Sequence, residues 1–167
     1  SLAALYAKVP GWPLGFGDKK KAEELFLKSL NANPDGIDPN FFYGEYLIDQ
    51  DRVAEGRGYL EKALKAAPTD PDANLAMADV LRLQGKSAAE VRRYLTSVKG
   101  DEVAARDAAL IAALVELRDK QPAKAKDALA KLDSGDGALE NRLVEGHVRR
   151  AVGVAVEKEA PEHRASN

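Results

Sequence analysis

Two short segments carry residue types that could bind a ligand. Residues 85–87 (Gly-Lys-Ser) have the ending of a phosphate-binding loop, but Val80 stands where its leading glycine belongs, and a predicted helix precedes it instead of a strand. Residues 31–36 match the start of a calcium loop, yet the closing bidentate glutamate falls on Phe42. We therefore expect both segments to be turns between helices.

The remaining candidates for catalysis or metal binding are few. The chain has 2 histidines and no cysteine, which removes disulfides, thiolate zinc sites and cysteine nucleophiles. His147 lies at the edge of a predicted apolar stripe and His163 in the C-terminal tail, and neither has the three protein ligands that zinc needs. No serine-hydrolase or zinc-protease motif occurs. We expect a non-enzymatic protein without a metal site or cofactor.

The composition narrows the class of partner. The 25 basic and 27 acidic residues are interspersed, and no basic stripe offers a footprint for phosphates. The longest apolar run, residues 108–115, is too short to cross a bilayer. We therefore expect neither a nucleic-acid partner nor membrane insertion.

A repeat of 34 residues organises the chain. Residues 38–47 and 72–81 keep small, acidic and apolar residues in the same order, and the match resumes one residue out of step at Tyr59 and Tyr94. This period, combined with helical spacing of the apolar residues, is typical of helix pairs that bury their apolar faces against one another.

Helix start signals divide the chain into these pairs. Asp18 and Asp38 are predicted N-caps, the third pair opens at Asp70, and Ser87 with Glu90 has the spacing of a capping box. The first pair ends at residues 34–36, and the helices of the second pair run to residue 49 and over 53–67. The third pair turns at 84–86, and its second helix has an apolar stripe comprising Val91, Tyr94, Leu95 and Val98.

The C-terminal part continues the pattern. A fourth pair begins at residues 100–101 and has Pro122 in the first turn of its second helix, and a last helix covers about residues 138–159. Residues 1–160 are predicted to form a single domain, and residues 161–167 a frayed tail.

The small and large residues of these pairs resemble the tetratricopeptide repeat family. The family pattern is met in the second unit by Gly44, Gly56, Leu60, Ala63 and Pro68, in the first by Ala22, Phe26, Ser29 and Pro34, and more loosely by Ala78, Tyr94, Ser97, Ala125, Leu129 and Leu132. The resemblance implies an all-α, right-handed α-solenoid of helix-turn-helix repeats with a C-terminal helix.

A narrower resemblance concerns the cellular compartment. Residues 12–47 are similar to a group of exported bacterial repeat proteins, including helper subunits of tripartite solute transporters. This implies the bacterial periplasm, with the cytoplasm as the alternative. The chain begins at Ser1, so the sequence does not show whether an export signal or a further repeat precedes it.

The family resemblance also indicates a binding face. In tetratricopeptide proteins the first helix of each pair lines the concave surface, which here corresponds to Phe41, Glu45, Ile48 and Asp49, followed by Leu75, Asp79 and Arg82. The face is apolar with an acidic bias, so we expect a partner segment with apolar anchors and basic residues. The predicted function is non-catalytic protein–protein binding, as an adaptor or assembly scaffold.

Two other functions remain open. A solute-binding helper of a transporter would use the loop at residues 12–18, with Trp12 lining a pocket for a small molecule. A self-assembling structural protein would use its apolar end against another copy, giving a homo-oligomer. An ordinary outer helix face is the alternative for each of the seven residues of the predicted face.

Overall fold

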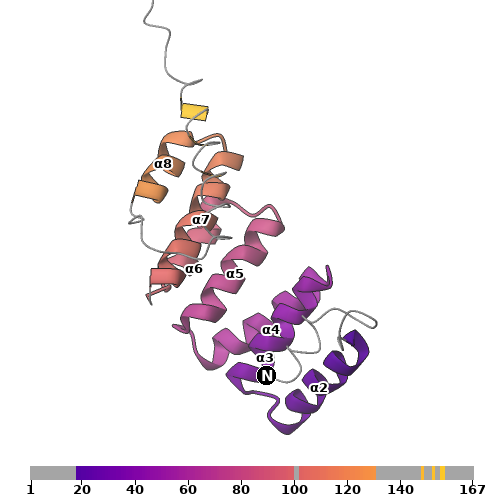
Figure 1. Ribbon diagram of the computed structural model, residues 1–167. Helices are drawn as coiled ribbons and strands as arrows, with labels where there is room; N and C mark the ends of the chain where they lie inside the picture. Colours follow the sequence, from indigo (N-terminus) through magenta and orange to yellow (C-terminus); the bar gives the residue numbers. More distant parts are fainter. Residues whose placement is uncertain (1–17, 100–101, 131–147, 149–151, 153–154, 157–167) are drawn as a thin grey trace, which may run out of the picture. The chain divides into compact units, whose positions relative to one another are not determined.

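The computed structural model describes residues 18–99, 102–130, 148, 152, 155 and 156 of the chain, and every regular element in this part is an α-helix (Figure 1). The predicted all-α class is therefore confirmed. The helices are α2 (Lys19–Ala32), α3 (Ile37–Asp49), α4 (Val53–Ala66), α5 (Pro71–Leu83), α6 (Ala88–Leu95), α7 (Glu102–Arg118) and α8 (Pro122–Ala130). None of the helices in this part is long and apolar enough to span a membrane.

The chain divides into two compact units, Ser1–Val80 and Leu81–Asn167. Each is described by itself below. Of the predicted last helix only residues 148, 152, 155 and 156 are described, and all four are helical. The predicted frayed tail lies outside the described residues.

Three of the predicted helix starts are confirmed. Asp18 Oδ1 accepts a hydrogen bond from the backbone N–H of Lys21 at 3.1 Å, which caps α2. Asp70 caps α5 in the same way, through a 2.8 Å bond from the N–H of Ala73. Ser87 and Glu90 form the reciprocal capping box of α6. In each case a side-chain oxygen satisfies an amide that the first helical turn leaves unpaired.

The predicted cap of α3 is wrong. The N-cap is Gly36, and Asp38 lies exposed within the first turn, one residue inside the helix. Its carboxylate there favours the positive end of the helix dipole without capping an amide. The helix starts earlier than predicted because Asn40 fixes the preceding turn.

Asn40 and Asn74 form the same hydrogen bonds 34 residues apart. Asn40 is fully buried, and its Nδ2 donates to the carbonyls of Pro34 at 2.8 Å and Gly36 at 2.7 Å. Nδ2 of the buried Asn74 donates to the equivalent carbonyls, those of Pro68 at 3.0 Å and Asp70 at 2.7 Å. The sequence period thus reappears as a repeated fastening of the turn to the next helix.

Three helices also end in the same turn. After α3, Asp51 takes a left-handed conformation (φ 61°) and the N–H of Arg52 donates to Leu47 O at 2.8 Å. The same six-residue closure follows α5, with Gly85 at φ 70° and a bond of 2.9 Å from Lys86 N to Leu81 O, and α7, with Lys120 at φ 56° and a bond of 2.8 Å from Gln121 N to Glu116 O. This is the Schellman termination. It makes Leu47, Leu81 and Glu116 equivalent positions.

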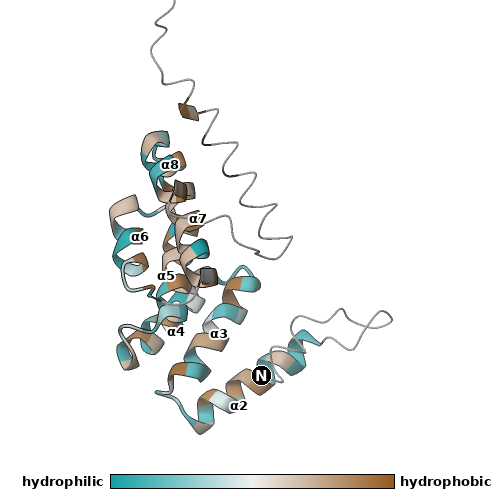
Figure 2. Cartoon of the chain, turned by 60° about the vertical axis from the view of Figure 1, so that its left-hand side comes forward, coloured by the Kyte–Doolittle hydropathy of each residue, from teal (hydrophilic) through white to brown (hydrophobic). Residues whose placement is uncertain are grey.

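Aromatic rings fill the core of α2, α3 and α4. The Phe26 ring lies 5.1 Å from that of Tyr46 and 6.0 Å from that of Tyr43, and Tyr59 of α4 meets Tyr43 edge-on at 4.8 Å. Burial of large rings in such offset and edge-on contacts makes a large contribution to stability. Figure 2 shows apolar and polar segments alternating along α3, as expected for a helix with one buried face.

Two glycines allow α3 and α4 to approach closely. A Cβ atom on Gly56 would lie 2.6 Å from the carbonyl oxygen of Gly44 and 2.8 Å from Cγ1 of Ile48. Such distances are below van der Waals contact, so this seam requires glycine. The predicted role of Gly44 as a small residue at a helix crossing fits this geometry.

Helix α6, in the second unit, is shorter than predicted. Helix α6 ends at Leu95. Val98 lies beyond the helix end, and its backbone N–H donates to Leu95 O at 3.2 Å. The predicted stripe is therefore wrong at Val98. Helices α7 and α8 pack through an apolar cluster comprising Leu110, Ala113, Ala125, Leu129, Val148 and Val152.

Candidate functional site

The structure places the first part of the predicted face along one side of α3. Phe41, Glu45 and Ile48 are half-buried and Asp49 is exposed, at the spacing that brings residues of a helix to one side. The Phe41 ring meets that of Phe42 edge-on, with centroids 5.2 Å apart. Phe42 itself is 36% exposed, so this side of α3 presents aromatic surface to solvent.

The second part of the predicted face lies along α5. Leu75, Asp79 and Arg82 are all half-buried and share the same helical spacing. The neighbouring Leu83 is 50% exposed. The boundary between the compact units falls after Val80, so Arg82 belongs to the second unit and the other two residues to the first.

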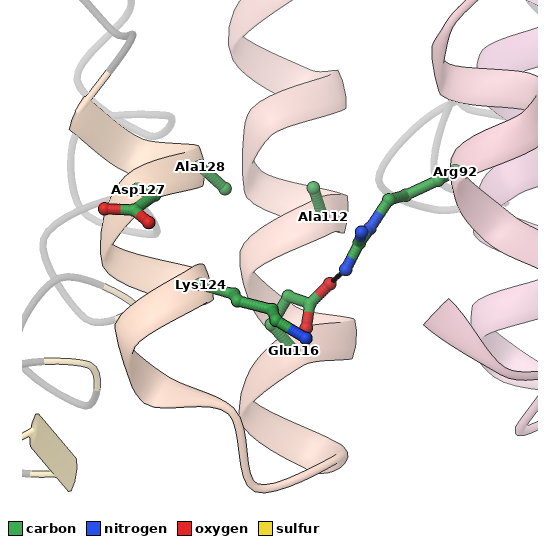
Figure 3. A pocket seen from close by; sticks show the side chains of 6 residues that line it. All are labelled: Arg92, Ala112, Glu116, Lys124, Asp127 and Ala128. Carbon is green, nitrogen blue, oxygen red and sulfur yellow. Dashed lines mark ion pairs between the residues drawn. The ribbon is translucent and has the colours of Figure 1, made fainter. Parts of the chain in front are cut away.

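A pocket of about 300 Å³ opens in the second unit (Figure 3). Side chains from three consecutive helices line it, and they carry two bases, two acids and two methyl groups: Arg92 of α6, Ala112 and Glu116 of α7, and Lys124, Asp127 and Ala128 of α8. Its size is at the lower end of the range for small-molecule sites.

The acid at the base of this pocket is buried. Glu116 is only 3% exposed and forms an ion pair with Arg92, whose side chain is 49% exposed. In Figure 3 the Lys124 side chain extends from α8 toward the same carboxylate. Removing a carboxylate from water is strongly unfavourable unless a cation and hydrogen bonds offset the loss, so Arg92 is the group that permits burial here.

The repeated turn shows what the pocket replaces. Glu116 takes the position that Leu47 and Leu81 hold, and both leucines are buried. One helical turn earlier, Ala112 takes the position of two large core residues, Tyr43 and Met77. A leucine position has become an acid, and a bulky position has become a methyl group.

Helix α8 shows a similar truncation. Helices α4 and α8 both begin directly after the repeated turn, so Ala128 is equivalent to Tyr59. The pocket therefore corresponds to the place where Tyr43 and Tyr59 meet edge-on in the first unit. Alanine at both positions leaves a hollow where the first unit has two rings.

The first unit has a charged cluster centred on Arg52. Arg52 donates to Glu23 at 2.7 Å and to both carboxylate oxygens of Glu55, at 2.8 and 2.9 Å. Hydrogen bonds from Arg52 and then from Tyr43 hold the pKa of Glu23 below its usual value. Burial, followed by the bond to Glu23, raises the pKa of Tyr43 to about 12.

The equivalences extend to these charges. Counting from their caps, Glu23 of α2 corresponds to Arg92 of α6, and Glu55 of α4 to Lys124 of α8. At these two positions the first unit has acids and the second unit has bases, whereas Arg52 corresponds to Gln121 and Glu116 to Leu47.

The sequence analysis did not single out the pocket residues. Its superposition covered 38–47 and 72–81 and stopped before α7, where Lys120 replaces the turn glycine Gly85. Placing Lys120 over Gly85 would have aligned Glu116 with Leu81, and an acid at a core position is the signal that was available.

The two segments with partial ligand motifs overlap the predicted turns between helices, at residues 33–36 and 84–87. Gly85 is the left-handed residue of a turn and Ser87 caps α6, while Arg118 donates to Lys86 O. Among the described residues no group of three or more acidic, histidine or cysteine side chains could hold a metal ion. Trp12, His147 and His163 lie outside the described residues.

Comparison with known proteins gives no further assignment, because no family model, curated protein or solved structure matches this chain.

Proposed function

We propose that this chain is a tetratricopeptide-like right-handed α-solenoid that binds a segment of another protein without catalysing a reaction. The observation that supports this most is the recurrence, at the sequence period, of one turn closure and one asparagine fastening. Helix pairs that repeat in this way bury one face against their neighbours and leave an extended face for recognition.

The chemistry of the proposed face defines the partner. Phe41 and Leu75 supply half-buried apolar anchors, while Glu45, Asp49 and Asp79 outnumber the single base Arg82. A partner segment with apolar side chains and lysine or arginine residues would complement this surface in both respects. It would bind extended or as a helix along α3 and α5.

A peptide-binding experiment tests the proposal. Peptides selected from a random display library on the immobilised chain should be enriched in basic and apolar residues, and their affinity should be measured by fluorescence anisotropy. The double variant Phe41→Ser, Leu75→Ser removes both anchors. Because each is already half-buried, partner binding would bury about half of its area, worth about 1 kcal/mol each, so we expect at least about tenfold weaker binding.

The matched control is Leu27→Ser on α2, which is 42% exposed and outside the proposed face. It should leave the affinity unchanged, and all variants should keep the helical circular dichroism of the parent. Equal affinity of the parent and the double variant for the selected peptides would contradict the proposed face.

The other two functions make different predictions. The solute-helper function depends on the loop at residues 12–18, of which residues 12–17 lie outside the described residues. Self-assembly predicts a mass that changes on dilution in sedimentation experiments, whereas an adaptor should keep one mass. The bacterial periplasm remains the predicted compartment, on the resemblance of residues 12–47.

A further inference from the structure

We propose that the pocket of the second unit binds a small zwitterion with an apolar body, of the size and charge pattern of a free amino acid such as phenylalanine. This site is separate from the proposed peptide-binding face. Its lining comes from α6, α7 and α8 and includes none of the seven face residues.

The hollow corresponds to specific differences between equivalent positions of the two units. The equivalent positions in the first unit hold Tyr43 and Tyr59, whose rings touch, and the second unit has Ala112 and Ala128. A core normally fills such space, because unfilled volume loses hydrophobic and dispersion energy. The space of about 300 Å³ therefore has the dimensions of a bound small molecule with an apolar body.

The buried acid is a further difference between equivalent positions. A leucine fits this position of the repeat, as Leu47 and Leu81 show. A buried carboxylate has a desolvation cost that its ion pair seldom offsets beyond what a well-packed apolar side chain contributes. Stability alone therefore does not account for a glutamate paired with Arg92 at this position, whereas recognition of a ligand by the carboxylate would.

The charges of the lining match those of a zwitterion. The lining carries two cations, Arg92 and Lys124, and two anions, Glu116 and Asp127. The guanidinium of Arg92 has five N–H donors, and its pair with Glu116 joins one Nη atom to one carboxylate oxygen. Its remaining donors and the ammonium of Lys124 suit a ligand carboxylate, while the acids suit a ligand ammonium. The methyl groups of the two alanines would contact the apolar body.

The experiment is isothermal titration calorimetry of the full chain with L-phenylalanine and two matched probes. 3-Phenylpropionate keeps the carboxylate without the ammonium, and phenethylamine keeps the ammonium without the carboxylate. We expect saturable one-to-one binding of L-phenylalanine, and binding of each single-charge probe weaker by about ten- to a hundredfold, because a charge-assisted hydrogen bond is lost. Equal binding of either probe would overturn the zwitterion assignment, and no saturable binding of any of the three would overturn the site.

Two variants locate the site by independent means. Glu116→Leu introduces the residue of the equivalent positions and removes the acid, and Ala112→Met refills the hollow with the side chain of Met77 while keeping every charge. Both should fold with melting temperatures close to that of the parent, and both should weaken L-phenylalanine binding at least about tenfold.

A charge-matched control completes the design. Arg92→Gln should weaken binding, whereas Arg93→Gln changes an exposed neighbour on α6 that does not belong to the lining, and should leave the affinity unchanged. If both Glu116→Leu and Ala112→Met bind L-phenylalanine as the parent does, the ligand lies elsewhere and the proposal is wrong. The Phe41→Ser, Leu75→Ser variant tests peptide binding separately, so its result neither supports nor contradicts the L-phenylalanine site.

Discussion

The α2–α3–α4 group and the α6–α7–α8 group follow one plan with opposite contents. In the first, Tyr43 and Tyr59 fill the space between helices and Arg52 joins two acids at the edge. In the second, alanines leave a hollow of about 300 Å³, and the buried Glu116 pairs with Arg92. The α3–α4 and α7–α8 turns have the same closure, so the difference between the two groups beside these turns lies in their side chains.

The difference shows where the repeat can vary without loss of its fold. The turn closure depends on backbone hydrogen bonds, which recur after α3 in the first group and after α7 in the second. The position one turn before the closure accepts tyrosine, methionine or alanine, at Tyr43, Met77 and Ala112. The shared turn closure therefore accommodates different side chains in the interior of the helix pair.

The largest expected effect is on the filled group. Tyr43→Ala installs the residue of Ala112 where the surroundings have not adapted to it, and removes a ring that is 4% exposed and bonded to Glu23. We expect a loss of about 3–5 kcal/mol in the free energy of unfolding, measured by urea denaturation. Phe42→Ala, at an exposed ring, should cost much less. Similar losses in the two variants would contradict the account of the aromatic core.

The second effect concerns the seam between paired helices. Gly56→Ala places a methyl group 2.6 Å from the carbonyl oxygen of Gly44, whereas α7 and α8 hold alanines at the equivalent positions, Ala113 and Ala125. Despite the better helix propensity of alanine, we expect about 1–3 kcal/mol of destabilisation from the clash. Gly58→Ala is the matched control, because a Cβ there meets no atom within 4 Å. It should stabilise the helix by up to about 1 kcal/mol. A neutral or stabilising Gly56→Ala would show that the two seams are equally wide.

The third effect is a pH dependence of the filled group. The pKa of Glu23 is lowered by Arg52 and Tyr43, so its contribution to stability is present above the ordinary value of 4.5 and is lost as the pH falls through its folded value. Because Glu23 is partly exposed, we expect Glu23→Gln to cost no more than about 1 kcal/mol at about pH 7. The difference from the parent should shrink at about pH 3, in urea titrations at both values. A constant difference would assign the effect to packing instead of charge.

The smallest effect is spectroscopic. The pKa of Tyr43 is raised to about 12 from an ordinary value of 10.0, because burial and Glu23 disfavour the phenolate. The folded state therefore loses stability as the pH rises from about 10 toward 12. In an ultraviolet titration of the 5 tyrosines, Tyr43→Phe should remove the latest step. If that step persists, it belongs to another tyrosine, such as Tyr46, whose pKa is also raised by burial.

Much of the helical framework could be predicted from the sequence, because its signals are local. The end of α3 at Asp49, the start of α4 at Val53 and the capping box of Ser87 with Glu90 each depend on neighbouring residues. Asp38 misled because an acid before a proline has the pattern of a cap. The deciding contact was made by Asn40, whose amide reaches back to carbonyls four and six residues away.

The candidate pocket could not be predicted with the same ease. Arg92 and Glu116 belong to different helices, and their pairing depends on packing that no short window of sequence contains. Glu116 also lies within an alanine-rich helix whose apolar periodicity is weak, so an acid there does not stand out as buried. The predicted face on α3 and α5 stays a prediction, because exposure alone does not distinguish a binding surface from an ordinary helix side.

The most direct test of the comparison is to give the hollow group the residues of its counterparts. The double variant Ala112→Met, Glu116→Leu carries Met77 and Leu81 onto α7, and its melting temperature should be measured beside that of the parent. If the repeated turns place equivalent side chains in equivalent spaces, the variant will fold with a melting temperature equal to or above that of the parent, because apolar packing replaces a buried ion pair. A melting temperature well below the parent's, or loss of a cooperative transition, would show that the two groups do not share one interior plan.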